Sequence, residues 1–229
     1  MQTNTFIDRR EGGRALAESL LPLSSWPDLV VLALPRGGVP VAFEVARALG
    51  APLDVCVVRK LGVPGHEELA MGAIASGGVE MINPRTVREL QITPDEIRRV
   101  IDGERRELER RELAYRDGRP PADVRGKTVI VVDDGLATGA SMTAAVTALR
   151  QREPKSIVVA TPVASSSACA SLRRIADACV CVLSPEPFYG VGMWYADFEQ
   201  TTDDEVRALL AASRTPGPAG SPANAALTV

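Results

Sequence analysis

The chain has 229 residues, enough for one α/β domain with a substantial core. Its 26 basic residues nearly balance its 29 acidic ones, so the sequence predicts no broad nucleic-acid surface. No apolar run approaches the roughly 18 residues that a membrane span needs, and residues 1–13 lack the apolar core of a secretion signal, which predicts a soluble cytoplasmic protein.

The first part of the chain predicts a helix, a strand and a second helix. Residues 7–21 place apolar side chains on a loosely helical face, which indicates a helix docked on the core. Residues 29–34 (LVVLAL) are typical of a strand buried on both faces. Residues 41–49 repeat apolar positions at helical spacing. The turn between this strand and this helix, Pro35-Arg36-Gly37-Gly38, carries a cation.

The next segment predicts a strand followed by an irregular loop. Residues 54–59 (DVCVVR) have the strand pattern and lead through Arg59 and Lys60 into residues 61–69 (LGVPGHEEL). Glycine and proline interrupt residues 61–69, so we expect a mobile loop there. Residues 73–82 then predict two short strands that return from this loop as a hairpin.

Residues 94–116 form a segment of dense alternating charge. Thr93 and Pro94 are typical of a helix start, and a narrow apolar stripe follows at helical spacing. Interleaved glutamates nearly cancel the arginines, which disfavours RNA binding. We therefore expect this helix to pack on its own domain or on a second subunit, and we expect a homodimer.

The most informative stretch is a strand that ends in two acidic residues. Residues 129–132 (VIVV) predict a buried strand, and Asp133 and Asp134 follow it directly. A glycine-containing turn then leads into an Ala-rich helix, whose first free N–H groups and dipole favour a phosphate group. Because like charges repel, the two carboxylates cannot bind that phosphate and instead predict sugar hydroxyls or a divalent cation beside it. The alternative is an ordinary polar turn.

Further strands and helices complete an α/β pattern. Residues 156–160 and 178–183 predict strands, with a helix at residues 164–176 between them. Strands that alternate with helices indicate a parallel sheet, with ligands at the carboxyl ends of its strands. Because the acidic pair and the Pro-Arg-Gly-Gly turn both follow predicted strands, we expect them to meet at that edge.

The C-terminal part contains an aromatic segment, a short helix and a tail. Residues 184–198 are rich in Phe, Tyr and Trp, which suits a pocket for a planar heterocycle or, equally, a cover for the sheet edge. Residues 202–210 predict a capped helix. Residues 214–229 are of low complexity and are expected to be disordered in solution. The four cysteines lack Cys-x-x-Cys spacing, which favours buried free thiols.

The sequence VVDDGLATGAS resembles the 5-phosphoribosyl 1-pyrophosphate (PRPP) motif of type I phosphoribosyltransferases. The resemblance covers roughly residues 29–198 and places the chain in a bacterial branch of unassigned acceptor. It implies a Rossmann-like, mainly parallel five-stranded sheet flanked by helices, with a flexible lid loop at residues 61–69 and a small hood at about residues 184–200. We expect one domain over residues 1–213, with the charged helix as an insertion.

The resemblance also implies roles for individual residues. Asp133 and Asp134 would act on the ribose and, with Asp197, hold Mg²⁺. The 5-phosphate would be bound by Ala137, Thr138, Gly139, Ala140 and Ser141. The pyrophosphate would be received by Arg36, Gly37, Arg59 and Lys60, and the turn that contains Arg36 resembles a family loop that often holds a non-proline cis peptide. A base would contact Phe188 and Tyr189.

The implied reaction transfers ribose 5-phosphate from PRPP to a nitrogen acceptor, expected to be a nucleobase, and releases pyrophosphate. Ala137 stands where hypoxanthine-guanine phosphoribosyltransferases have an Asp, which argues against 6-oxopurine acceptors. Two other functions stay open. One is a non-catalytic PRPP-binding regulatory protein on the same fold. The other is a phosphatase or phosphohydrolase that uses Asp133 as a metal ligand or nucleophile.

Overall fold

The predicted parallel sheet is present in the computed structural model, which describes residues 5–214. Its five strands lie in the order β2-β1-β6-β7-β8, and each neighbouring pair is parallel. The strands are β1 (Leu29–Ala33), β2 (Leu53–Val55), β6 (Thr128–Val132), β7 (Ser156–Val163) and β8 (Ala178–Leu183). Every residue of β1 and β6 is buried, as their continuous apolar runs predicted.

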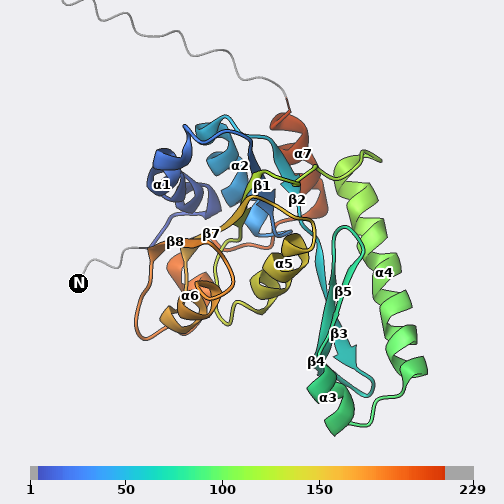
Figure 1. Ribbon diagram of the computed structural model, residues 1–229. Coiled ribbons are helices and arrows are strands. Elements are labelled where there is room, and N and C mark those ends of the chain that lie inside the picture. Colours follow the sequence, from blue (N-terminus) through green and yellow to red (C-terminus); the bar gives the residue numbers. More distant parts are fainter. Residues whose placement is uncertain (1–4, 215–229) are drawn as a thin grey trace, which may run out of the picture.

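Helices cover both faces of this sheet (Figure 1). They are α1 (Arg9–Leu20), α2 (Gly38–Leu49), α5 (Ala140–Arg150), α6 (Ser166–Leu172) and α7 (Asp203–Ala212). Alternate strand residues divide between two core clusters: Ile130 belongs to the cluster that contains residues of α1, α2 and α7, whereas Val131 belongs to the cluster that contains residues of α5 and α6. Gly50, at φ 62°, ends α2 in the left-handed conformation that favours glycine.

A second, three-stranded antiparallel sheet extends from one side of the main body (Figure 1). It consists of β3 (Val58–Val63), β4 (His66–Ala75) and β5 (Val79–Ile82), and α3 (Pro84–Glu89) follows it. The strand predicted at residues 54–59 is therefore wrong as a single element. Residues 54–55 belong to β2 and residues 58–59 to β3 in the other sheet, and residues 56–57 connect the two strands. The hairpin predicted at residues 73–82 is confirmed as the end of β4 and β5.

The irregular loop predicted at residues 61–69 is also wrong, because this segment forms the β3–β4 hairpin. Gly62 lies at a register shift, where a Cβ atom would approach the carbonyl oxygen of Glu67 to 2.8 Å. Gly65, at φ 75°, lies in the turn between the strands. These glycines allow close strand approach and a tight turn rather than breaking the strands.

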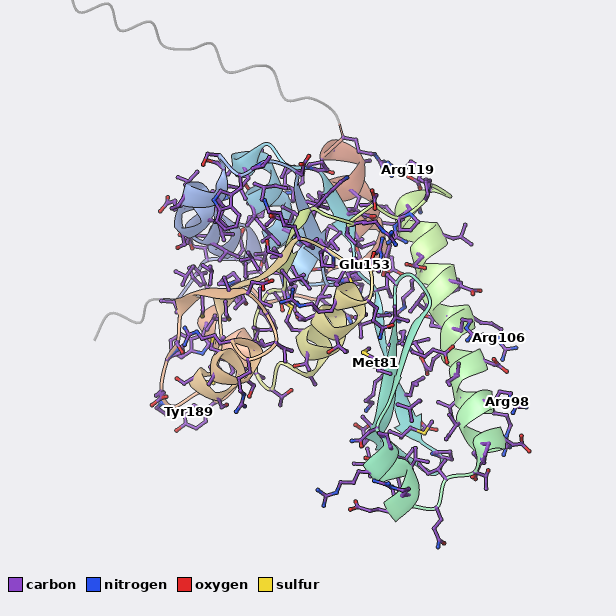
Figure 2. All side chains as sticks on the ribbon, in the orientation of Figure 1. Met81, Arg98, Arg106, Arg119, Glu153 and Tyr189 are labelled. Carbon is purple, nitrogen blue, oxygen red and sulfur yellow. The ribbon has the colours of Figure 1, made fainter. Side chains whose placement is uncertain are left out.

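Helix α4 (Pro94–Arg116) confirms the charged helix. Thr93 and Glu96 form a reciprocal capping box at its start, and Ile101, Leu108 and Tyr115 are buried. The helix packs on β3, β4 and α7 of its own chain. Its outward face carries exposed charges, among them the labelled Arg98 and Arg106 (Figure 2). The helix thus packs on its own domain, which is the first of the two expected arrangements. The homodimer stays a prediction.

The remaining described segments contain two short 3₁₀ helices and irregular backbone. Residues 184–200, expected as a hood, contain the short 3₁₀ helix η2 (Val191–Trp194) and otherwise irregular backbone. A second 3₁₀ helix, η1 (Leu21–Leu23), follows α1. All of the predicted tail after residue 214 lies outside the described residues. Within residues 5–214, no helix combines the length and the apolarity that a bilayer crossing requires.

Candidate active site

The acidic pair lies at the carboxyl end of β6, as predicted. The backbone N–H of Asp134 donates to Oδ1 of Asp133 at 2.9 Å, which fixes the Asp133 carboxyl beside the next peptide unit. Burial, and after it the neighbouring charge of Asp134, raise the pKa of the Asp133 carboxyl well above its usual range. Among the described residues, Asp133 forms no ion pair, so its carboxylate suits a cation or hydroxyl donors from a ligand.

The Pro-Arg-Gly-Gly turn packs directly on this pair. A Cβ atom at Gly37 would overlap the carboxylate of Asp134, and one at Gly38 would lie 2.7 Å from the carbonyl oxygen of Val132. The Pro35-Arg36 peptide is cis, as the resemblance implied. The turns after β1 and β6 therefore meet at the predicted edge of the sheet, and glycine at two positions permits their contact.

We expect Gly37→Ala to disrupt this contact. Gly37 has φ −58° and ψ −31°, which alanine adopts readily, so the main obstacle to the methyl group is the carboxylate of Asp134. Forcing the methyl group in should lower the free energy of unfolding by about 1–3 kcal/mol, measured by urea denaturation. The matched control is Gly103→Ala in α4, where a Cβ atom meets nothing within 4 Å. It should stabilise the protein by about 0.4–1 kcal/mol. Equal effects of both substitutions would contradict this packing.

The turn at residues 137–141 has the geometry of an anion site. Gly139, at φ 72°, precedes α5, and no side chain caps that helix start. The amide of Ala140 makes one long contact, 3.4 Å to Oγ1 of Thr138. Ser165 fixes the turn from the start of α6, because its hydroxyl donates to the carbonyl oxygen of Ala137 at 2.6 Å. The first amides of α5 are thus held in place and available to a phosphate group.

The residues predicted to bind pyrophosphate are not all gathered here. Arg36 lies 3.7 Å from a carboxylate oxygen of Asp203 at the start of α7. Arg59 donates to Glu104 of α4 at 2.7 Å, and Lys60 donates to the carbonyl oxygen of Glu68 at 3.1 Å. Both line a cleft of about 460 Å³ between the small sheet and α4. Of the four residues predicted, only Gly37 contacts the acidic pair within the described part of the chain.

The aromatic and acidic residues predicted in the hood also lie apart from the pair. Phe188 is partly buried and packs with Phe6 and Val163. Tyr189 is 77 % exposed and lies at the rim of the molecule (Figure 2). Asp197 is exposed, and its carboxylate accepts from the amide of Glu199 at 3.0 Å.

The structure adds a contact that sequence analysis missed. Arg9, in the first turn of α1, donates from Nε to Oδ2 of Asp134 at 2.8 Å. Tyr195 donates its hydroxyl to the backbone carbonyl oxygen of Asp134 at 2.6 Å. No local signal singles out Arg9, because Arg10 lies in the same first turn of α1 and Asp134 is 125 residues away in the sequence.

A magnesium ion fits this site only with ligands from a bound phosphate compound. Within residues 5–214, no three or more His, Cys, Asp or Glu side chains cluster as a metal site, and Asp197 does not join the pair. Mg²⁺ commonly takes one or two protein carboxylates and completes its shell with water and substrate phosphates. Asp133, with Asp134 beside it, can supply such a partial set.

Comparison with known proteins adds three findings. The family model described as "Phosphoribosyl transferase domain" matches residues 10–188. Proteins from two strains of Mycobacterium tuberculosis, which bear the provisional name phosphoribosyl transferase, are 45% identical over 205 residues. The alignment covers 90% of this chain and 46% of theirs, so this chain spans about half their length. The crystal structure of TT1426 from Thermus thermophilus is 45% identical, with a TM-score of 0.80, over 91% of this chain and 98% of that one.

Proposed function

The chain belongs to the phosphoribosyl transferase domain family, and from that premise we propose that it transfers ribose 5-phosphate from PRPP to a nitrogen acceptor, with release of pyrophosphate. The expected acceptor class is a nucleobase. The observation that carries the proposal is the contact of the Gly37-Gly38 turn with the acidic pair, because it brings two strand-end turns to one edge. The anion-binding turn before α5 follows the same strand, β6.

Each part of PRPP has a matching group in this arrangement. The amides of residues 139–141 suit the 5-phosphate, and the carboxylate of Asp133 suits the ribose hydroxyls. The turn at residues 36–38 lies beside the pair, which suits a place for the pyrophosphate that would leave the anomeric carbon. Arg36 would reach the pyrophosphate by leaving its 3.7 Å contact with Asp203, which is weak because both side chains are partly exposed.

The reaction requires positioning and charge stabilisation more than proton transfer by a side chain. The bond between the anomeric carbon and the pyrophosphate oxygen breaks with its electron pair on oxygen. The acceptor nitrogen forms the new bond with its lone pair, and the proton that this nitrogen carried passes to solvent. Positive charge develops on the ribose ring, where the negative charge of Asp133 stabilises it. When bound, Mg²⁺ neutralises part of the negative charge of the pyrophosphate. Backbone amides hold the 5-phosphate, so the ring stays aligned with the acceptor.

Titration calorimetry with PRPP, with and without Mg²⁺, tests the proposal. We expect PRPP to bind in the presence of Mg²⁺ and its affinity to fall at least tenfold after chelation with EDTA, because the acidic pair and the pyrophosphate would then repel each other. A screen of nucleobases and amines for pyrophosphate release then identifies the acceptor. Binding without turnover of any acceptor would favour the regulatory alternative. Consumption of PRPP without an acceptor would favour a phosphohydrolase, and absence of PRPP binding would refute the proposal.

A further inference from the structure

We infer that Arg9 gives the two acidic residues different tasks: it holds the Asp134 carboxylate in place and leaves the Asp133 carboxylate for the ribose of the ligand. Arg9 would then be a positioning residue. The inference rests on the proposed function, because the ligand in question is PRPP. Arg9, Tyr195 and Phe198 all lie outside residues 10–188, the span that the family model matches.

The guanidinium of Arg9 is held on several sides. Besides the 2.8 Å hydrogen bond from Nε to Asp134, its Nη1 donates to the carbonyl oxygen of Glu199 at 2.7 Å. Its Cζ lies 3.9 Å from the centre of the Phe198 ring, a cation–π distance. The side chains of Arg9 and Asp134 are only 12% and 15% exposed, so solvent weakens this pair little. Arg9 thus has one defined position, and it fixes that of the carboxylate.

The hood fastens the other end of Asp134. The Tyr195 hydroxyl donates to the Asp134 carbonyl oxygen, and burial raises the pKa of Tyr195, so the phenol keeps the proton that it donates. The Tyr195 ring stacks on Phe198, with centroids 5.2 Å apart and planes at 21°. Gly192 permits the approach of Phe198, since a Cβ atom there would lie 2.8 Å from its Cδ1. Side chain and backbone of Asp134 are therefore held from two elements, α1 and residues 195–199.

Asp133 has a different environment. Its Oδ1 accepts from the amide of Asp134 at 2.9 Å, and its carboxyl also interacts with the Asp134 side chain beside it. The charge of Asp134 is balanced by Arg9, but no basic side chain within residues 5–214 pairs with Asp133. Arg9 acts on Asp133 only from a distance, so Asp133 is the carboxylate of the pair without an ion-pair partner of its own, and it keeps acceptor capacity for ribose hydroxyls. Arg9 keeps Asp134 from competing for that ligand and anchors the backbone from which Asp133 projects.

The test compares Arg9→Gln with Arg10→Gln in calorimetric titrations with PRPP and, separately, with inorganic pyrophosphate, both with Mg²⁺. Arg10 is the matched control: it is the next residue of α1, its side chain is 51% exposed, and its nearest carboxylate oxygen, on Glu44, is 3.9 Å away. We expect Arg9→Gln to weaken PRPP binding by about 10–100-fold, the usual cost of losing a group that orients a ligand-binding residue. Pyrophosphate affinity should change less than about twofold, because pyrophosphate has no ribose to contact Asp133. Arg10→Gln should leave both affinities unchanged.

A second variant covers the possibility that Arg9→Gln does not fold. Arg9→Lys keeps the charge, but a single ammonium group cannot bind both the Asp134 carboxylate and the Glu199 carbonyl oxygen as the planar guanidinium does. This variant should therefore also lose affinity for PRPP and keep its affinity for pyrophosphate. Unchanged PRPP affinity in both variants, with wild-type protein that binds PRPP, would overturn this inference alone. Equal loss of PRPP and pyrophosphate binding would assign Arg9 a general structural role and also overturn it. Wild-type protein that binds no PRPP would refute the proposed function, and this inference with it.

Discussion

Replacing Asp133 with asparagine is expected to lower PRPP-dependent turnover by about 10²–10³-fold and, at the same time, to stabilise the folded protein at neutral pH. The loss of turnover follows from removing the negative charge that faces the developing positive charge on the ribose. The gain in stability, about 1 kcal/mol, follows from removing a buried charge that lies beside Asp134 without a cation of its own. Asparagine keeps the Oδ1 atom that accepts the Asp134 amide, so the local backbone is retained.

The stability effect has a defined pH dependence. Burial and then Asp134 raise the pKa of Asp133 in the folded state, so the folded protein holds this proton more tightly than the unfolded chain does. The stabilisation from this bound proton is therefore fully present below the pKa that Asp133 has in the unfolded chain. It is lost as the pH rises through the pKa that Asp133 has in the folded protein. Thermal unfolding from about pH 4 to about pH 8 measures this effect. The Tm of Asp133→Asn should be higher than that of the wild type at neutral pH, and the difference in Tm should shrink toward low pH.

Asp134→Asn is the matched control for this substitution. It removes one carboxylate of the same pair, but it also breaks the hydrogen-bonded ion pair with Arg9. It should therefore lower stability where Asp133→Asn raises it, because it leaves the largely buried Arg9 guanidinium without its partner. Two variants with the same sign of stability change at neutral pH would show that the pair is not divided as its contacts indicate.

The main sheet was predictable because the burial of its strands is visible in the sequence as continuous apolar runs. A strand covered on both faces needs apolar residues throughout, so runs such as residues 29–34 and 129–132 can be located without knowledge of their partners. The acidic pair was predictable for a related reason: charged residues directly after such a run must lie at the carboxyl end of a buried strand, where parallel α/β sheets bind ligands. The same rule predicted that the turn at residues 35–38 would lie at this edge, although it did not predict that Gly37 packs on Asp134.

The small sheet was harder to predict because its pairing depends on register. Residues 61–69 contain two glycines and a proline, which a local reading takes as a loop. Once β3 pairs with β4, Gly62 becomes the point where the backbones can approach, and Pro64-Gly65 becomes the turn. Whether glycine interrupts a strand or permits a close contact depends on what lies opposite, and that information is distant from the local pattern.

The candidate site was incomplete in sequence analysis for the same reason. Arg9 and Asp134 are 125 residues apart, and no spacing rule connects them. Composition suggested an aromatic base pocket at residues 184–198, but Tyr195 and Phe198 stack on each other and Phe198 also contacts Arg9. Composition identifies which side chains are available. It does not identify which of them are already engaged by one another.

Arg116→Ala should be the most destabilising of the substitutions considered, at about 3–5 kcal/mol. The side chain is 6% exposed at the end of α4, and its guanidinium donates to Asp54 at 2.9 Å, to Glu112 at 2.8 Å and to the carbonyl oxygen of Val55 at 2.8 Å. Asp54 in turn accepts the amide of Ala122 at 2.7 Å. One buried cation thus joins α4, strand β2 and the segment that leads into β6.

Removing Arg116 would leave the Asp54 carboxylate, which is 14% exposed, without its cation, and that unpaired charge accounts for most of the expected cost. Urea denaturation measures the effect, with Arg110→Ala as the matched control. Arg110 lies on the same helix and also pairs with a carboxylate, but it is 59% exposed and its partner Glu107 keeps Arg111. The control should therefore cost less than about 1 kcal/mol.

Because Arg116 fixes α4 at the point where β2 leads into the small sheet, hydrogen exchange in α4 and β3 should accelerate more than exchange in β6. Equal acceleration throughout the chain would show that the small sheet and the main sheet unfold as one unit and that Arg116 does not join two separable parts.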